Sequence, residues 1–199
     1  MLVALRRSAT MTLICLVIFG FAYGFAGTGV AQLLFHTNAE GSITTDGSTL
    51  IGQNWTSPKW FHGRPDDAGP YATNRRANVP GGDNPLVANG VAGGSAATNL
   101  GPRSAMLVAN TKALIAYWHR FGVNPTPDLV TTSGSGYDPD INPADALVQV
   151  PMVAKATGIA PATLRSLILR QTHGAQFGFL GSSYIDVLQL NESLAKVTA

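Results

Sequence analysis

The sequence predicts an α+β protein in which one N-terminal transmembrane helix precedes a single loop-rich extracytoplasmic domain. Three observations lead to this prediction. Residues 9–35 contain no charged side chain and directly follow Arg6, Arg7 and Ser8. Residues 36–199 are long enough for one domain and are rich in Gly, Asn, Ser, Thr and Pro, which favours many loops. Helical periodicity in this part is followed by one β-rich segment near the C-terminus.

The uncharged run 9–35 predicts a helix that crosses a membrane once. A hydrocarbon core of about 30 Å requires roughly 20 apolar residues, and a single span must be helical because every backbone N–H and C=O needs an internal partner. Basic residues favour the cytoplasmic side of a span. Because two arginines precede the run and the first acidic residues follow it, residues 1–8 are expected in the cytoplasm and residues 36–199 outside it.

A cleaved secretory signal peptide is the alternative interpretation of the same segment. It would have the basic start and apolar centre seen here, with a small-residue cleavage site at residues 29–31. Apolar residues resume after that site, at residues 33–35, which favours an anchor. Either interpretation exports the rest of the chain.

The charge balance of the exported part argues against nucleic-acid binding. Two of the 13 basic residues precede the apolar run, which leaves 11 to match the 11 acidic residues downstream. The domain is therefore formally neutral, whereas a nucleic-acid-binding domain needs a clustered basic face. The sole cysteine, Cys15, lies in the apolar run, so an intramolecular disulfide is excluded. The four histidines show no Cys/His spacing typical of zinc.

The first part of the domain is expected to be extended and then irregular. Residues 48–55 predict a short strand or extended segment. Trp60, Phe61 and Arg64 follow as two aromatic side chains beside a guanidinium, which indicates a docking surface or the edge of the core. Residues 66–98 are low in complexity and predict a flexible loop insert.

Two helices are predicted next. The first is expected to begin at residues 99–102, with a proline near its first turn, and to end at Gly122. Residues 104–121 place apolar side chains along one helical stripe, which consists of Leu107, Leu114, Trp118 and Phe121. Asn142 and Asp145 form a capping pair around Pro143, so a helix should run from there to Thr157 and end at Gly158.

The C-terminal part is predicted to contain a further helix and a strand. Pro161 suits the first turn of a helix that reaches residues 173–174, with Leu164, Leu167, Ile168 and Gln171 on its inner face. Residues 184–190 are rich in β-formers and predict a strand, and residues 191–196 predict one helical turn.

The segment 130–143, VTTSGSGYDPDINP, contains the most chemistry-bearing residues. Its hydroxyl and glycine run (Ser133, Gly134, Ser135 and Gly136) before a helix N-terminus is compatible with an anion cradle, but the lysine and spacing of a phosphate-binding P-loop are missing. Asp138, Asp140 and Asp145 are compatible with a cation such as calcium, without the spacing of an EF-hand. A plain turn that positions the next helix is the third interpretation. A serine hydrolase is disfavoured because no GxSxG motif is present.

Segments along nearly the whole chain resemble one known family. VTTSGSGYDPDINPADALVQVPMVAKA at residues 130–156 is similar to the C subunit of the bacterial high-affinity Kdp-type potassium-transporting ATPase. Further elements agree in the same order: FHGRP at 61–65, NLGP at 99–102, GFLG at 178–181 and VLQLN at 187–191. The sequence departs from the family pattern at Arg103, Tyr137 and Met152, and in the length of the insert 66–98.

The resemblance implies a non-catalytic subunit of a bacterial cell-membrane complex. Its partners would be a channel-like potassium-binding subunit, a P-type ATPase subunit and membrane lipid, and potassium would be the transported ion. The family's C subunit is assigned a catalytic-chaperone role that raises the affinity of the ATPase subunit for ATP. By this resemblance the ATP-linked positions would be Ser133, Gly134, Ser135, Gly136 and Gln149. Candidate contacts with partner subunits are Gly20, Gly24, Trp60, Phe61, Arg64, Asp138 and Asp140.

The predicted topology conflicts with direct ATP contact. If the two arginines remain inside, the serine-glycine run lies about 30 Å of hydrocarbon away from cytoplasmic ATP. We therefore expect the domain to lie over the external mouth of the channel-like subunit and to act on nucleotide through the membrane helix. An anchored extracytoplasmic module that binds a ligand or wall polymer on Trp55, Trp60 and Phe61 is the alternative function.

Overall fold

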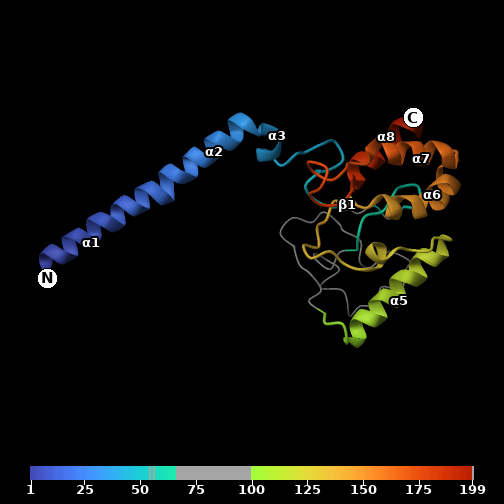
Figure 1. Cartoon of the computed structure of the whole chain (residues 1–199), viewed down its shortest axis with the longest axis horizontal. Helices are drawn as coiled ribbons and strands as arrows, with labels where there is room; N and C mark the ends of the chain where they lie inside the picture. The colour runs from blue at the N-terminus through green and yellow to red at the C-terminus, as the bar shows by residue number, and fades with distance from the viewer. Residues whose placement is uncertain (54, 56, 66–99, 199) are drawn as a thin grey trace. The chain divides into compact units, whose positions relative to one another are not determined.

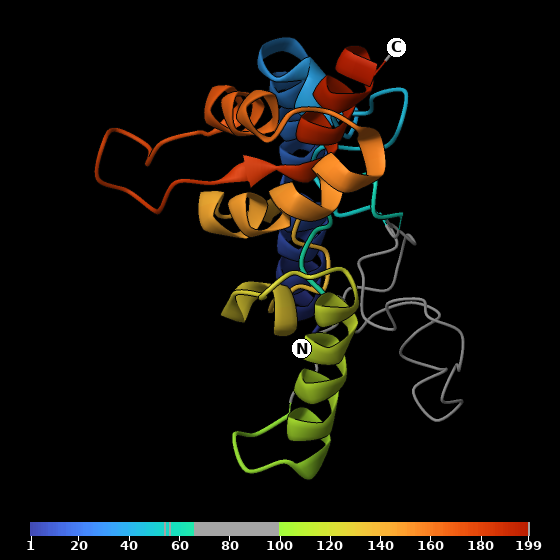
Figure 2. The same cartoon turned by 90° about the vertical axis from the view of Figure 1, so that its right-hand side faces the viewer.

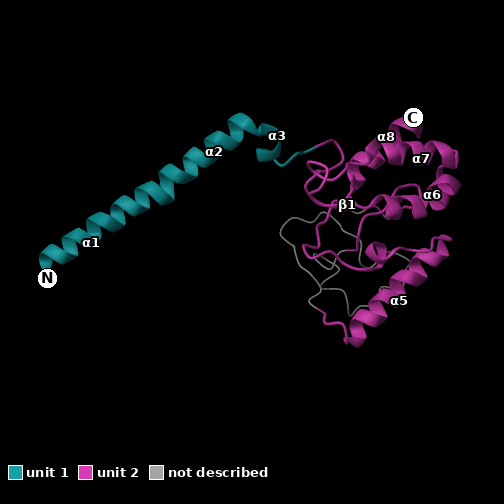
Figure 3. Cartoon of the chain, viewed as in Figure 1, with its two compact units in different colours: residues 1–43 teal, residues 44–199 magenta. Residues whose placement is uncertain are grey.

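The computed structural model describes residues 1–53, 55, 57–65 and 100–198. The chain divides into two compact units, Met1–Ile43 and Thr44–Ala199 (Figure 3). We call them unit 1 and unit 2 and describe each by itself. The predicted insert 66–98 lies outside the described residues.

Unit 1 is built on one long helical run. It consists of α1 (Leu2–Cys15), the π-helical segment η1 (Leu16–Ala22) and α2 (Tyr23–Leu34), and a short helix α3 (His36–Ala39) follows (Figure 1). The run of 33 residues has a mean hydropathy of 2.0 in its most apolar window and is long and apolar enough to cross a membrane. At 1.5 Å per residue it spans roughly 50 Å, more than the hydrocarbon core requires.

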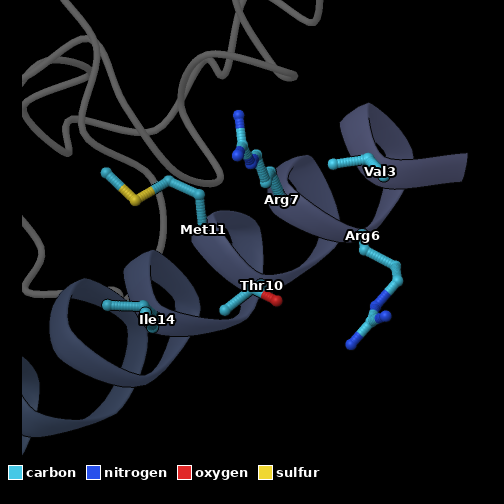
Figure 4. Close-up of a pocket in the computed structure, with 6 residues that line it drawn as sticks. All are labelled: Val3, Arg6, Arg7, Thr10, Met11 and Ile14. Carbon is cyan, nitrogen blue, oxygen red and sulfur yellow. The ribbon is translucent and has the colours of Figure 1, made fainter. Parts of the chain in front are cut away.

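The helix begins at Leu2, so both arginines lie on it rather than before it. Leu, Ala and Arg are good helix formers, which explains why the N-terminal residues continue the helix of the apolar run. Figure 4 shows the side chains of Arg6 and Arg7 pointing away from α1 on different sides, around a shallow hollow. Two charges on different sides of one turn make it costly to move this end of the helix into hydrocarbon.

Unit 2 is rich in helices and has one small sheet, which agrees with the α+β class. Its helices are α5 (Ala105–Arg120), the 3₁₀ turn η2 (Pro127–Val130), α6 (Pro143–Thr157), α7 (Pro161–Gln171) and α8 (Val187–Thr198). The strands β1 (Asp140–Ile141) and β2 (Ile185–Asp186) pair antiparallel, with Asp140 opposite Asp186 and Ile141 opposite Ile185. Among described residues this is the only sheet.

The boundaries of α6 follow from the predicted caps. Asn142 and Asp145 form a reciprocal capping box at the start of α6, Pro143 occupies the first turn, and Gly158 ends the helix with a left-handed φ of 76°. The hydroxyl of Ser104 accepts a hydrogen bond from the Leu107 amide at the start of α5. The helices predicted to begin at residues 143 and 161 are confirmed. The helix predicted to begin at residues 99–102 begins at Ala105 instead, because Ser104 caps it.

One strand prediction is confirmed only in part and one fails. In the predicted strand 184–190, Tyr184 forms a β-bridge with His173, and Ile185 and Asp186 form β2. The remaining residues are helical, because the Asp186 carboxylate accepts a hydrogen bond from the backbone N–H of Gln189 at 2.8 Å and starts α8. The described residues of 48–55 form turns and irregular backbone. There the Gln53 side chain donates to the carbonyls of Ser48 and Ile51 instead of leaving them for a neighbouring strand.

The core of unit 2 lies where α6, α7 and α8 pack together and meet the C-terminal half of α5. Leu114 and Trp118 of the predicted stripe on α5 are buried, whereas Leu107 and Phe121 are half-buried. The Trp118 indole donates to the carbonyl of Leu129 at 3.0 Å and so fixes η2 against α5. The predicted inner face of α7 is buried at Leu164, Leu167 and Ile168.

Candidate functional site

A buried polar clamp holds residues 61 and 62, the start of the FHGRP segment. The Gln149 amide on α6 accepts from the His62 N–H at 2.8 Å and donates to the His62 carbonyl at 3.0 Å. Asn191 on α8 does the same for Phe61, with distances of 2.9 and 2.8 Å. Both amide side chains are almost fully buried. The clamp gives a non-helical segment the backbone partners that a strand would otherwise supply.

The His62 ring is held in the core in its neutral form. Burial lowers the pKa of His62 to about 4, although a hydrogen bond to the Ser57 carbonyl opposes this shift. The neutral ring donates from Nε2 to that carbonyl at 3.1 Å, while Nδ1 faces the Tyr117 hydroxyl at 3.5 Å. Trp118 packs on the ring with centroids 5.3 Å apart. His62 is therefore a structural residue of the core.

Arg64 connects the clamped segment to the serine-glycine loop. Its Nη1 donates to the Asp138 carboxylate at 3.2 Å, and its Nη2 donates to the Thr132 carbonyl at 3.4 Å. The Asp128 carboxylate lies 4.0 Å from Nη2 of Arg64 and accepts a hydrogen bond from the side-chain amide of Asn142 at 2.8 Å. One guanidinium thus joins residues 61–65 to both ends of the loop before α6.

Replacing Arg64 by methionine is expected to lower the free energy of unfolding of unit 2 by about 1 kcal/mol. The loss is modest because the ion pair is partly exposed, and screening by salt should reduce it further. Urea unfolding of the full chain in detergent, at low and high salt, measures both effects. Equal stability of the variant and the wild-type chain at low salt would contradict the assigned role of Arg64.

The serine-glycine run forms a turn closed by its own hydroxyl groups. The Ser133 hydroxyl accepts from the Gly136 amide at 2.9 Å, and the Ser135 hydroxyl accepts from the Tyr137 amide at 3.1 Å. Gly136 has a φ of 72°, which favours glycine at this position. Ser133 is buried, whereas Gly134 and Ser135 are exposed. This geometry matches the turn interpretation of the sequence.

The structure does not bring Gln149 and the serine-glycine run together by hydrogen bonds. The Gln149 side chain bonds to the backbone of His62 and of Asp145, and it has no exposed surface. An ATP-linked role of Gln149 would therefore have to act through the clamped segment. Phe61 is also fully buried, so a partner contact there would be equally indirect.

The aromatic side chains beside the clamp are engaged within unit 2. Trp55 and Trp60 meet edge to face with ring centroids 5.3 Å apart, and both pack against the core. Lys59 lies over the Trp60 ring at 5.0 Å. Trp60 also lines a hollow of about 260 Å³ with residues of α6 and α8. A flat stacking platform for a wall polymer is not what this arrangement presents.

The aspartates of the loop differ in their hydrogen bonds and in their pKa values. Asp138 accepts from the Asp140 amide at 3.1 Å as well as from Arg64. Asp145 is fully buried within the capping box and accepts from the Thr126 hydroxyl. Burial raises the pKa of Asp140 to about 6, and the charges of Asp138 and Asp186 add to this shift. Burial is also the main cause of the raised pKa values of Asp145 and Asp186.

No cluster of three or more metal-binding side chains occurs in the described part of the chain. The calcium interpretation of Asp138, Asp140 and Asp145 therefore has no ligand set in this geometry. Asp140 instead lies directly opposite Asp186 in the β1–β2 pair. Like charges at such positions repel, which favours protonation of one member.

The shifted groups predict two opposing effects of pH on stability. Between about pH 4 and 6.5 the unfolded chain binds a proton at His62 that the folded chain excludes, so stability rises with pH. Between pH 3.8 and about 6 the folded chain retains a proton on Asp140 that the unfolded chain releases, so stability falls with pH. The Asp140→Asn variant removes only the second contribution.

We therefore expect Asp140→Asn to make the unfolding free energy rise more steeply with pH between 4 and 6.5. Denaturant unfolding of the full chain at a series of pH values measures the slope. Asp46→Asn, which removes the same charge from an exposed position of unit 2, is the matched control. A slope for Asp140→Asn that is no steeper than that of the wild-type chain would contradict the prediction.

The roles of Asn191 and His62 in the clamp were not predicted from the sequence. Gln149 was named only through the family resemblance. The available signal was a polar side chain on the buried stripe of an amphipathic helix: Gln149 falls between Ala146 and Val153 on α6. Such residues need a partner, but the sequence does not say which backbone supplies it.

The comparisons with known proteins cover nearly the whole chain. The family model described as "KdpC: K+-transporting ATPase, c chain" matches residues 5–196. A protein named potassium-transporting ATPase KdpC subunit from Methylobacterium nodulans is 39% identical over 202 residues, covering 98% of this chain and 97% of the relative. A relative of the same name from Methylorubrum extorquens is 40% identical over 198 residues, covering 96% of this chain and 96% of the relative. Another, from Koribacter versatilis, is 38% identical over 198 residues, covering 96% of this chain and 93% of the relative. The resemblance seen in the sequence is thereby confirmed, and the chain belongs to the KdpC family, the c chains of K+-transporting ATPases.

Proposed function

We propose that this chain is a non-catalytic accessory subunit of an ATP-driven, high-affinity potassium import complex. Its membership of the KdpC family over residues 5–196 carries the proposal. The apolar helix Leu2–Leu34 supports an anchor in the bacterial cell membrane. The partners would be the channel-like potassium-binding subunit and the P-type ATPase subunit of the same pump.

The two arginines support an orientation with unit 2 outside the cytoplasm. Arg6 and Arg7 lie near the start of the membrane helix, and the positive-inside tendency favours the cytoplasm for this end. Unit 2 would then lie over the external mouth of the channel-like subunit and stabilise the complex. The buried polar groups of unit 2 hold its own loops in place, which suits a rigid docking domain.

Any effect on ATP would then be indirect. The hydroxyls of the serine-glycine turn bond within the turn, and Gln149 is buried. With unit 2 outside, about 30 Å of hydrocarbon separates these residues from cytoplasmic ATP. A catalytic-chaperone effect would require the membrane helix to bias two states of the ATPase subunit, with Gly20 and Gly24 as candidate contacts. Beyond the adjacent helix backbone, a Cβ at Gly24 would meet no described atom within 4 Å, which leaves room for a neighbouring helix.

Deletion of unit 2 tests the proposed role. A chain that retains residues 1–43 is co-expressed with the other pump subunits in cells lacking the full chain. We expect loss of the purified complex and of potassium uptake at low external potassium, because the docking domain is missing. Unchanged assembly and uptake would contradict the proposal.

A second experiment separates indirect from direct action on ATP. Ser135→Ala and Gly134→Ala change exposed positions of the turn without a clash, since a Cβ at Gly134 would meet nothing within 4 Å. We expect both variants to leave the KM of the complex for ATP unchanged, whereas omission of the whole subunit should raise it. A several-fold increase of KM in either variant would show direct contact with nucleotide.

A further inference from the structure

The loop between α7 and β2 forms a hairpin that projects from unit 2 (Figure 2). His173 and Tyr184 exchange two backbone hydrogen bonds of 2.9 and 3.0 Å at its base, and their rings stack with centroids 5.0 Å apart. Gln176 and Leu180 exchange two further bonds of 2.8 and 2.9 Å near its tip. The hairpin is therefore a defined structure with a closed base and a tight turn.

The tip of this hairpin exposes large apolar side chains. Phe177 and Phe179 are 86% and 76% exposed, and Leu180 is 48% exposed. Phe177 has a φ of 53°, a conformation that bulky side chains rarely adopt. Leu169, near the C-terminal end of α7, is 72% exposed as well. Exposed apolar side chains gathered on a projecting turn are typical of a protein–protein or membrane interaction site.

Basic side chains are the only charged ones in the helix that leads into the hairpin, whereas Asp140 and Asp186 lie beyond its base. Residues 146–185 contain no Asp or Glu. They include Lys155, Arg165 and Arg170, and the two arginines lie exposed on α7. The only ion pairs in the described part of the chain involve Arg64, so these arginines have no acidic partner there. Arg170 lies three residues before the hairpin base at His173, and each basic residue near a bilayer surface attracts anionic headgroups by about 1 kcal/mol.

The chain keeps unit 2 close to the membrane. Only residues 35–43 connect the end of the membrane helix to the start of unit 2, and four of them form α3. At 1.5 Å per helical residue and 3.3–3.6 Å per extended residue, this connection reaches roughly 25 Å. A lipid surface is therefore available to an exposed face of unit 2 whichever side of the membrane it occupies.

We propose that the hairpin 173–184 and the exposed face of α7 form a second membrane contact. Phe177, Phe179 and Leu180 enter the interfacial layer of the bilayer, and Arg165 and Arg170 bind anionic headgroups. This contact restrains the orientation of unit 2 above the membrane. It does not rest on the proposed role in potassium transport and would stand if that role failed.

Depth-dependent quenching in lipid nanodiscs tests the contact with the full chain. Cys15 is first replaced by serine, and one cysteine is introduced either at Phe179 or at Ala116, an exposed position on α5. Both positions carry the same environment-sensitive dye, and the lipids are a mixture of phosphatidylglycerol and phosphatidylcholine with a nitroxide quencher. We expect a blue-shifted emission and a strong loss of intensity at position 179 and little change at 116. Equal emission and quenching at both positions would overturn the proposal.

Variants that leave the dye position unchanged separate the contributions of apolar and of basic side chains to membrane binding. The dye is placed at Gly174, where a Cβ would meet nothing within 4 Å. Phe177→Ser with Phe179→Ser should abolish quenching, and neutralising each arginine as Arg165→Gln or Arg170→Gln should lower the ratio of bound to free hairpin roughly fivefold. Quenching that persists in the double serine variant would overturn the proposal. So would shielding of the dye at 179 that arises only with the other pump subunits present, because the hairpin would then dock on protein.

Discussion

Replacing Gln149 by methionine is expected to lower the free energy of unfolding of unit 2 by about 3 kcal/mol. Methionine has a similar volume, so the change removes hydrogen bonds rather than packing. The backbone N–H and C=O of His62 would remain buried without the partners that now lie at 2.8 and 3.0 Å. A buried polar group left unsatisfied costs about 1–3 kcal/mol, and two such groups are created.

Denaturant unfolding of the full chain in detergent, followed by tryptophan fluorescence, measures this loss. Gln176→Met is the matched control because Gln176 is exposed and engages the hairpin only through its backbone. We expect the control to change stability by less than about 0.5 kcal/mol. Wild-type stability of Gln149→Met would mean that Gln149 does not hold the FHGRP segment. A raised KM for ATP in such a stable variant would then favour a nucleotide-linked role.

Replacing Trp118 by alanine is expected to have the largest effect of any single change, about 3–5 kcal/mol. Trp118 is fully buried, packs against His62 and Tyr117, and donates to the Leu129 carbonyl at 3.0 Å. Its loss leaves a cavity at the junction of α5 and η2. We expect the C-terminal half of α5 to detach from the core before the rest of unit 2 unfolds, because few other side chains of α5 are buried.

Two further variants define the origin of this loss. Trp118→Phe keeps one aromatic ring in place but removes the bond to Leu129 and leaves a smaller cavity than alanine, so it should cost about 1–3 kcal/mol. Met106→Ala truncates an exposed side chain on the same helix and should cost less than about 0.5 kcal/mol. Hydrogen exchange of the α5 amides detects the detachment. Equal losses in Trp118→Ala and Met106→Ala would refute the central position of Trp118 in the core.

Features determined by neighbouring residues could be predicted from the sequence. The cap at Asn142, the proline at 143 and the left-handed Gly158 each act within a few residues, and the α6 boundaries followed from them. The strand predicted at 184–190 is confirmed only in part because β-rich residues in a short run also suit one buried face of a helix. Val187, Leu188 and Leu190 occupy such a face on α8.

The arrangement of the clamp could not be predicted in this way. Gln149 and His62 are separated by 87 positions, and Asn191 and Phe61 by 130. Neither residue pair has a local signature, because an amide side chain can bond to any backbone that the fold brings near it. The family resemblance could be found because it rests on short segments, such as FHGRP and VLQLN, that occur in the same order along the chain as in the family. It did not indicate that these segments are bound to each other in the core.

The orientation of unit 2 decides between indirect and direct action on ATP, and labelling of intact cells measures it most directly. Ser135→Cys is introduced after Cys15→Ser, since Ser135 is exposed and cysteine is close to it in size. A membrane-impermeant thiol reagent is then applied to intact cells and to lysed cells. Our account predicts equal labelling in both, because unit 2 lies outside the cytoplasm. Labelling only after lysis would contradict it and would bring the serine-glycine turn to the side where ATP is bound.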